Sequence, residues 1–279
     1  MPARISTATL AISVLLAFCG LALLGLGYSL YLNHQLQGQL VALSTQLDQA
    51  VSPVRLRAVI ESTLVDLRNE QRLAEQQALF AGYQAASSNL GERHPNQHIY
   101  GNTQARFTLV EFADTECGYC KRFHSTPKQI VDASNGAVNW EYKSMPILSA
   151  ASLLHANALE CVAEVNGNPA FWVFLDQLYQ HTGSTPIDLL ALANKLGVEE
   201  SGFKRCLAER RHQGKIDASL EMAKHNGVHG TPATFVVDNH TGQRLLLGGA
   251  QPLEAFLAAM RRLQSEASDS RVVSGDEPG

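Results

Sequence analysis

The sequence predicts an α/β protein with a helical insertion, preceded by a transmembrane helix and a helical stalk. Three observations lead to this class. Two stretches rich in β-branched and aromatic residues lie on either side of a helical stretch between residues 106 and 145. A long helical block follows, and two more strand-like stretches come after it. The first 33 residues are almost free of charge, which is typical of a membrane span.

Composition supports a folded chain and argues against nucleic acid as a partner. The 279 residues are 45 % apolar and 17 % charged, which is the balance of a globular protein. The formal net charge is -4, so the chain has no overall basic field that would attract DNA or RNA.

The N-terminal segment, residues 1–33, predicts a single-pass membrane anchor. From Ile5 to Asn33 there is no charged side chain, and this length exceeds the roughly 20 residues that cross a bilayer. No clear small-residue cleavage site follows, so we favour an uncleaved anchor over a signal peptide. Arg4 lies before the span and Asp48 is the first charge after it. This asymmetry predicts a cytoplasmic N-terminus, with the remaining chain exported.

Residues 34–95 predict a helical stalk and linker. Leucines recur at intervals of four, three and four residues, at Leu36, Leu40, Leu43 and Leu47. This is the spacing of a coiled-coil seam. Ser52 and Pro53 form an N-cap and first helical position, so one helix ends and another begins there. Two interpretations stay open: a solvated spacer, or a segment through which the chain forms a homo-oligomer.

Residues 96–264 predict the α/β domain itself. Strand-like sequence over 106–114 and 137–145 flanks helical sequence that runs from Cys117 to Val131. This order predicts a βαβ unit with two parallel strands. The remaining predicted elements, in order, are a helical block over 150–226, strands over 233–238 and 243–249, a helix over 252–263 and a disordered tail over 265–279.

Cys117 and Cys120 form a Cys-x-x-Cys pair at the junction of a predicted strand and helix. The first sulfur then lies at a helix N-terminus, where free N–H groups and the helix dipole stabilise a thiolate. Cys120, one turn into the helix, can attack a mixed disulfide formed at Cys117. A structural zinc site would need a second such pair or suitably spaced histidines, and the sequence has neither. We therefore expect no metal and no organic cofactor.

Two motifs carry a resemblance to a known family. "FTLVEFADTECGYCKRFH" (107–124) and "GVHGTPATFVV" (227–237) resemble the thioredoxin-fold disulfide oxidoreductases of the DsbA, DsbC and DsbG group, over about residues 100–264. The resemblance implies a cis peptide bond at Pro232, packed beside the active-site sulfurs. It also implies that Thr231 and Pro232 offer backbone contacts to an extended substrate segment, next to Gly118 and Tyr119 of the active-site motif.

Glu111 lies six residues before Cys117 in an otherwise apolar predicted strand. It resembles the buried acid beneath the redox pair of DsbA-like proteins. A buried carboxylate there could accept and return the proton of Cys120. The alternative is that strand alternation directs this side chain to water.

Cys161 and Cys206 lie in the helical insertion, outside the redox motif. In an oxidising compartment they most simply form a structural disulfide that closes a loop of about 45 residues. Two separate buried thiols and a second shuttle pair are the alternatives.

The predicted function is thiol:disulfide exchange on exported cysteine-containing proteins, with a membrane redox partner that recycles the active site. The resemblance implies an anchor in the inner (cytoplasmic) membrane, with the catalytic domain on the periplasmic side. Three directions of exchange stay open: oxidase, isomerase and reductase. Gly118, Tyr119 and Thr231 resemble a DsbC-type site, whereas the helical insertion resembles DsbA-type architecture. A different class of function is the alternative: a membrane-tethered, non-enzymatic copper-binding chaperone or assembly scaffold.

Overall fold

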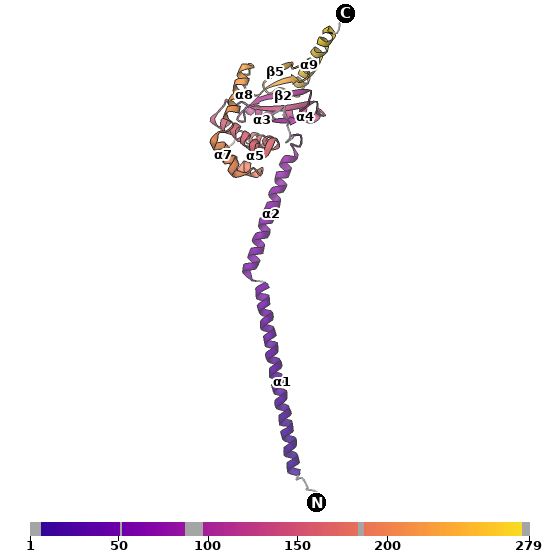
Figure 1. Ribbon diagram of the computed structural model, residues 1–279, viewed down its shortest axis with the longest axis vertical. Helices are drawn as coiled ribbons and strands as arrows, with labels where there is room; N and C mark the ends of the chain where they lie inside the picture. The colour runs from indigo at the N-terminus through magenta and orange to yellow at the C-terminus, as the bar shows by residue number, and fades with distance from the viewer. Residues whose placement is uncertain (1–6, 51, 87–96, 184–186, 275–279) are drawn as a thin grey trace. The chain divides into compact units, whose positions relative to one another are not determined.

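The computed structural model describes residues 7–50, 52–86, 97–183 and 187–274 (Figure 1). Contacts within the chain divide it into two units, Met1–Glu70 and Gln71–Gly279. We describe each unit by itself.

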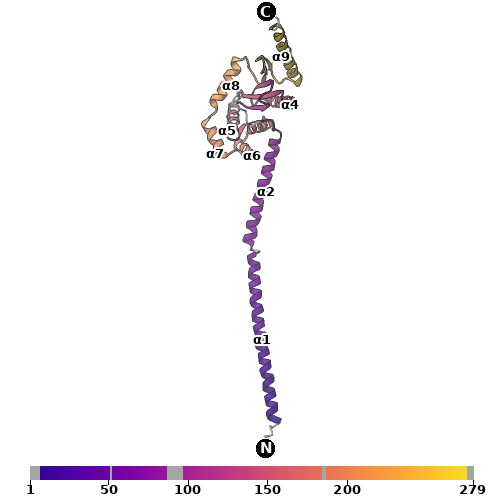
Figure 2. The same ribbon diagram turned by 45° about the vertical axis from the view of Figure 1, so that its right-hand side comes forward.

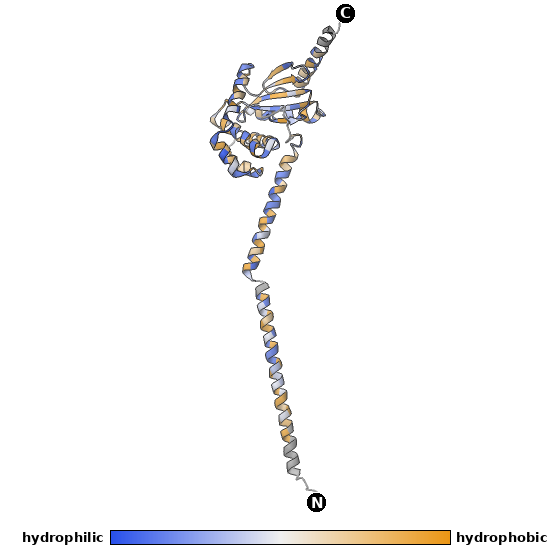
Figure 3. Ribbon diagram, in the orientation of Figure 1, coloured by the Kyte–Doolittle hydropathy of each residue, from blue (hydrophilic) through white to orange (hydrophobic). Residues whose placement is uncertain are grey.

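The first unit is helical. Helix α1 spans Thr7–Ala50 and continues through the predicted boundary at residue 33, and α2 begins at Pro53 and ends at Ala81. Ser52 caps α2 as predicted, because its Oγ accepts the Arg55 N–H at 3.2 Å. Figure 3 shows apolar residues concentrated in the part of α1 nearer the N-terminus. The leucines of the predicted seam are exposed, so self-association stays a prediction.

No helix within the described residues combines the length and apolarity needed to cross a membrane. The predicted anchor over 1–33 is therefore not confirmed, and its first six residues lie outside the described part of the chain.

A five-stranded sheet of order β1-β3-β2-β4-β5 forms the centre of the second unit (Figures 1 and 2). Its strands are β1 (Ile99–Gly101), β2 (Phe107–Ala113), β3 (Val138–Ser144), β4 (Ala233–Asp238) and β5 (Arg244–Gly248). β2 and β3 are parallel, which confirms the predicted βαβ pair, and the other pairs are antiparallel. β1 was not predicted, because three residues are too short to show a period.

Helices cover both faces of this sheet. The helices are α3 (Gly118–Phe123), α4 (Ser125–Ala133), α5 (Ala150–His181), α6 (Leu189–Lys195), α7 (Glu200–Glu209), α8 (Gln213–His225) and α9 (Leu253–Ser274). Alternate residues of β2 enter two apolar clusters. Leu109 and Ala113 belong to the larger one, with α3, α4, α5 and α9, whereas Phe112 belongs to the smaller one, with α8.

The structure differs from prediction at both ends of the second unit. The predicted disordered tail over 265–279 is wrong as far as Ser274, because α9 continues to that residue and the Ala267 side chain is buried. Residues 275–279 lie outside the described part. At the other end, Tyr83 is buried and packs edge-on against Tyr100. The segment from Gln71 to Ala86, expected in the stalk, therefore contributes to this core.

A buried charged group joins the insertion to the start of β1. Glu160 Oε2 on α5 accepts a hydrogen bond from the Lys215 ammonium of α8 at 2.6 Å, and it lies 2.8 Å from His98 Nε2. Burial alone would raise the pKa of Glu160, but His98 and Lys215 outweigh burial and lower it to about 2.

We predict that Glu160→Gln lowers the free energy of unfolding at neutral pH by about 2 kcal/mol, because it removes the buried carboxylate that pairs with His98 and with the partly exposed Lys215. The folded-state pKa of Glu160 lies below its ordinary value of 4.5, so its contribution is present above about pH 4.5 and is lost as pH falls toward 2. Chemical denaturation across this range measures both effects. Glu221→Gln, an exposed change on α8, is the control; a Glu160→Gln curve that parallels wild type down to low pH would contradict the prediction.

Candidate active site

The turn between β2 and α3 is held by Asp114. Its backbone carbonyl accepts the Cys117 N–H at 3.0 Å, and its carboxylate accepts the Glu116 N–H at 2.9 Å. The same carboxylate accepts the backbone N–H groups of Ile147 and Leu148, at 2.9 and 3.0 Å. Through these hydrogen bonds, Asp114 holds the turn that contains Cys117 against the loop that follows β3. We did not identify it from the sequence, although an aspartate directly after a strand is a typical turn residue.

Cys117 is the N-cap residue of α3. Its backbone is extended (φ -79°, ψ 115°), and its sulfur accepts the Cys120 N–H at 3.5 Å. Burial alone would raise the pKa of Cys117, but hydrogen bonds from the Cys120 backbone and the Thr231 side chain outweigh burial and lower it. The predicted position of the first sulfur at a helix N-terminus is therefore present, and it favours the thiolate.

Cys120 has the opposite character. Its side chain is fully buried in the larger apolar cluster, and burial raises the pKa of its thiol. Both cysteines are free in this structure. One helical turn therefore holds an outer thiol poised to ionise and an inner thiol that keeps its proton.

The second motif meets the first at this point. The Thr231–Pro232 peptide bond is cis, as the resemblance implies. The Thr231 carbonyl oxygen lies 3.5 Å from Cys117 Sγ and accepts its thiol hydrogen. Strand pairing explains the approach, because Ala233 at the start of β4 lies opposite Phe112 near the end of β2. Thr231 and Pro232 are thereby placed beside the end of β2 from which Cys117 follows.

Gly118 and Tyr119 lie on the surface between the two cysteines. Tyr119 is 63 % exposed, and the Arg122 guanidinium lies 4.4 Å from the centroid of its ring. A Cβ added at Gly118 would meet only the end of the Arg122 side chain within 4 Å. The exposed dipeptide is accessible to a second protein at this edge, but its role in binding stays a prediction.

Glu111 is buried, with 1 % of its surface exposed, so the interpretation that it points to water is wrong. Its Oε2 has no hydrogen-bond partner within the described structure. Burial raises the pKa of Glu111 to about 8, and the nearby Trp140 side chain offsets only part of this effect. The charge of Glu111 also raises the pKa of Cys120, so the two groups interact. Its role as a proton relay stays a prediction.

Two further contacts complete the surroundings of the pair. Thr182, after α5, donates its hydroxyl to the Thr115 carbonyl oxygen at 2.7 Å. Lys121 donates to the Gln180 and Thr182 carbonyl oxygens at 3.2 and 3.1 Å. The helical insertion is therefore fastened directly to the active-site turn. Sequence reasoning missed these contacts, because they join segments about 60 residues apart.

Cys161 and Cys206 form a disulfide between α5 and α7. Both side chains are fully buried. Cys161, Cys206 and His212 form a group of potential metal ligands. Within the described residues, Cys117 and Cys120 do not belong to a group of this kind.

A family model described as thioredoxin matches residues 93–247. The chain is similar to Na(+)/H(+) antiporter NhaA 3 of Salinispora tropica, with 31 % identity over 187 residues, which cover 64 % of this chain and 28 % of the antiporter. Antiporter NhaA 1 of Salinispora arenicola is 30 % identical over 58 % of this chain and 24 % of its own length. The chain thus spans about a quarter of these curated relatives.

Among solved structures, the chain is similar to DsbA2 of Pseudomonas aeruginosa, with a TM-score of 0.54 and 26 % identity. The match covers 61 % of this chain and 95 % of DsbA2. A thioredoxin-like oxidoreductase of Silicibacter pomeroyi also matches with a TM-score of 0.54 and 26 % identity, over 64 % of this chain and 96 % of its own.

We predict that Glu111→Gln makes the reduced protein more stable, increasingly so as pH rises. The pKa of the Glu111 carboxyl is about 8 in the folded state and 4.5 when it is unperturbed. The full stability of the wild-type fold is therefore present below about pH 4.5, and stability is lost as pH rises from there through the folded-state pKa near 8. The variant lacks this loss, so its advantage in free energy of unfolding grows across that window by roughly 5 kcal/mol.

Chemical denaturation of both reduced proteins, from about pH 4 to about pH 9, measures this difference. Glu254→Gln, at an exposed position of α9, is the control. A constant difference between Glu111→Gln and wild type over the whole range would show that Glu111 does not have a raised pKa.

Proposed function

Because the chain belongs to the thioredoxin family and has a DsbA-like fold, we propose that it exchanges thiols and disulfides with other proteins through Cys117 and Cys120. The resemblance stated from the two motifs is confirmed, and the structural neighbours support the predicted class of thiol:disulfide oxidoreductase. The proposal rests on the position and the acidity of the Cys117 sulfur. It caps α3, its pKa is lowered, and it lies beside the cis Thr231–Pro232 bond.

The proposed exchange begins at Cys117. In the oxidised protein, a substrate thiolate attacks Cys117 of the Cys117–Cys120 disulfide and releases Cys120, which takes up a proton. A second substrate thiolate then attacks the substrate sulfur of the mixed disulfide and releases the Cys117 thiolate. The substrate gains a disulfide and the protein becomes the dithiol. In the reverse direction, the Cys117 thiolate attacks a substrate disulfide and forms a mixed disulfide with the substrate. Cys120 then attacks the Cys117 sulfur of this mixed disulfide and releases the reduced substrate.

The geometry favours the oxidising direction. Stabilisation of the Cys117 thiolate lowers the free energy of the dithiol form, and a dithiol that is stabilised belongs to a stronger oxidant. Cys120 must gain a proton on release, because its pKa is raised. Glu111 interacts with Cys120 and has a pKa near 8, so it holds a proton at neutral pH that it can pass to the released sulfur.

We predict that the wild-type protein oxidises a reduced test protein faster than it reduces insulin, and that Cys117→Ser abolishes both reactions. Cys120→Ser is expected to accumulate a mixed disulfide at Cys117, because the resolving thiol is absent. Free-thiol titration of the test protein and non-reducing mass spectrometry follow these outcomes. Cys19→Ser, a change at an exposed free cysteine of α1, is the control. Full activity of Cys117→Ser would refute the proposal, and faster insulin reduction would reverse the direction.

The location of the exchange is a further part of the proposal. We propose that residues 1–33 anchor the chain in the inner membrane, with the second unit on the periplasmic side, where exported cysteine-containing proteins are its substrates and a membrane redox partner restores the disulfide. The uncharged run from Ile5 to Asn33 supports this placement. So do the apolar side chains that α1 exposes between Leu15 and Leu32.

We predict that the full chain stays with the membrane fraction during an alkaline wash. Leu21→Arg combined with Leu24→Arg is expected to release it, because charged side chains are costly inside a bilayer. The matched control is Leu40→Arg combined with Leu43→Arg, also on exposed positions of α1 but beyond the proposed anchor. Release of the unmodified chain by the alkaline wash would contradict the anchor.

A further inference from the structure

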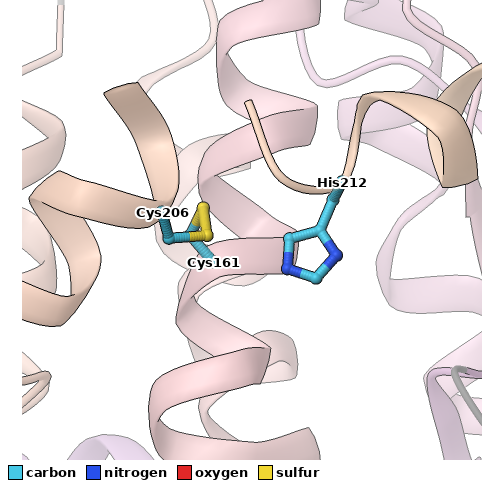
Figure 4. A group of neighbouring side chains, drawn as sticks. All are labelled: Cys161, Cys206 and His212. Atoms are coloured by element: carbon cyan, nitrogen blue, oxygen red, sulfur yellow. A yellow bond between two sulfur atoms is a disulfide. The ribbon is translucent and has the colours of Figure 1, made fainter. Parts of the chain in front are cut away.

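His212 lies beside the Cys161–Cys206 disulfide (Figure 4). The figure shows the imidazole ring directed toward the two sulfurs from the loop before α8, while the cysteines come from α5 and α7. The two Sγ atoms and a ring nitrogen of His212 all lie within 4.8 Å of one another. Both cysteines are fully buried, whereas the His212 side chain is 25 % exposed, so the group is accessible from one side.

Glu164 lies at the edge of this group. Its Oε2 lies 2.8 Å from His212 Nε2 and 3.6 Å from Cys206 Sγ. Its other oxygen, Oε1, is paired with the Arg211 guanidinium. Arg211 therefore holds the carboxylate in an orientation that leaves Oε2 facing the sulfur and the imidazole. The Glu164 carboxylate thus borders the group formed by the two sulfurs and the imidazole nitrogen, on the side of Cys206 and His212.

One pair of these donors already has the spacing of a tetrahedral site. Zinc binds thiolate sulfur at about 2.3 Å and imidazole nitrogen or carboxylate oxygen at about 2.0–2.2 Å, so its ligand atoms lie roughly 3.5 Å from one another. The Glu164 Oε2 to Cys206 Sγ distance of 3.6 Å already has this value. The site requires two adjustments. The two sulfurs must separate after reduction, and His212 Nε2 and Glu164 Oε2, now 2.8 Å apart, must exchange their mutual contact for contacts to the ion. Magnesium and calcium are poor candidates, because they prefer oxygen ligands only.

We propose that Cys161 and Cys206, when reduced, bind a zinc ion together with His212 and Glu164. In the oxidised protein the two sulfurs are bonded to each other and offer no thiolates, so the site is closed. A dithiol reductant opens it: the Cys161–Cys206 bond breaks, two thiols form, and the reductant becomes a disulfide. Zinc then binds the two thiolates and displaces their two protons.

This site gives α5 and α7 a second way to stay joined. The disulfide connects the two helices under oxidising conditions, and the zinc ion connects the same cysteines under reducing conditions. The insertion, which is fastened to the active-site turn through Thr182, is thereby held in both states. The inference does not rest on the proposed exchange at Cys117, and it is tested without that pair.

The test uses the full chain carrying Cys19→Ser, Cys117→Ser and Cys120→Ser, so that Cys161 and Cys206 are its only cysteines. A phosphine reduces the disulfide and is then removed under anaerobic conditions. Zinc is titrated in competition with a chromogenic chelator, and cobalt(II) reports tetrahedral thiolate ligation by its visible and charge-transfer bands. We expect one equivalent of zinc in the reduced protein and none in the oxidised protein.

Ligand variants identify the site. His212→Ala and Glu164→Gln, in the same background, are each expected to weaken zinc binding about 10-fold or more. His225→Ala, a change at an exposed histidine of α8, is the control and is expected to leave the affinity unchanged. Unchanged affinity in Glu164→Gln would remove Glu164 as the fourth ligand. Unchanged affinity in His212→Ala would overturn the site.

Two more outcomes decide the proposal. Reduced protein that takes up no stoichiometric zinc while its circular dichroism stays native overturns it. If reduction alone unfolds the protein, zinc is expected to restore the native spectrum and raise the melting temperature, since binding energy then becomes folding energy. Failure of zinc to restore the fold would also overturn the proposal.

Discussion

The hydrogen bond from the Cys120 backbone N–H to the Cys117 sulfur is the interaction on which the active site depends. It makes the reactive sulfur the cap of a helix, where unpaired N–H groups favour negative charge. The surrounding fold serves to hold this cap in place. Asp114 fixes the turn, and the central position of β2 in the sheet fixes Asp114. The antiparallel pairing of β4 with β2 brings the cis Thr231–Pro232 bond to the same sulfur.

Burial divides the chemistry between the two cysteines. Cys117 and Cys120 are three residues apart, yet the pKa of one is lowered and that of the other is raised. Glu111 lies on the strand that leads to this pair, and its buried carboxyl opposes ionisation of Cys120. A carboxyl without a hydrogen-bond partner at Oε2 reduces the stability of the fold at neutral pH. Its persistence beneath a reactive pair is consistent with a functional role.

The helical insertion is held by three residues of α5 within a span of five positions. Glu160 faces His98 and Lys215, whereas Cys161 is bonded to Cys206, and Glu164 pairs with Arg211 and His212. Burial of charge on one side and a covalent link on the other fix α5 to α8 and α7. This rigidity matters for the active site, because the end of α5 contacts the active-site turn through Thr182.

The sequence by itself determined the strands that pair in parallel, the cysteine motif and the start of α2 at Ser52–Pro53, because each depends on local chemistry or on hydrophobic patterns within short segments. The cis proline followed from the resemblance of two sequence motifs to a known family. It did not determine β1, the length of α9 or the burial of Tyr83, since packing against distant residues decides each of these. Only the tertiary structure decided that Glu111 is enclosed and that Asp114 joins two loops. The gathering of Glu164 and His212 around a disulfide likewise required it, because three helical segments must fold together before those atoms meet.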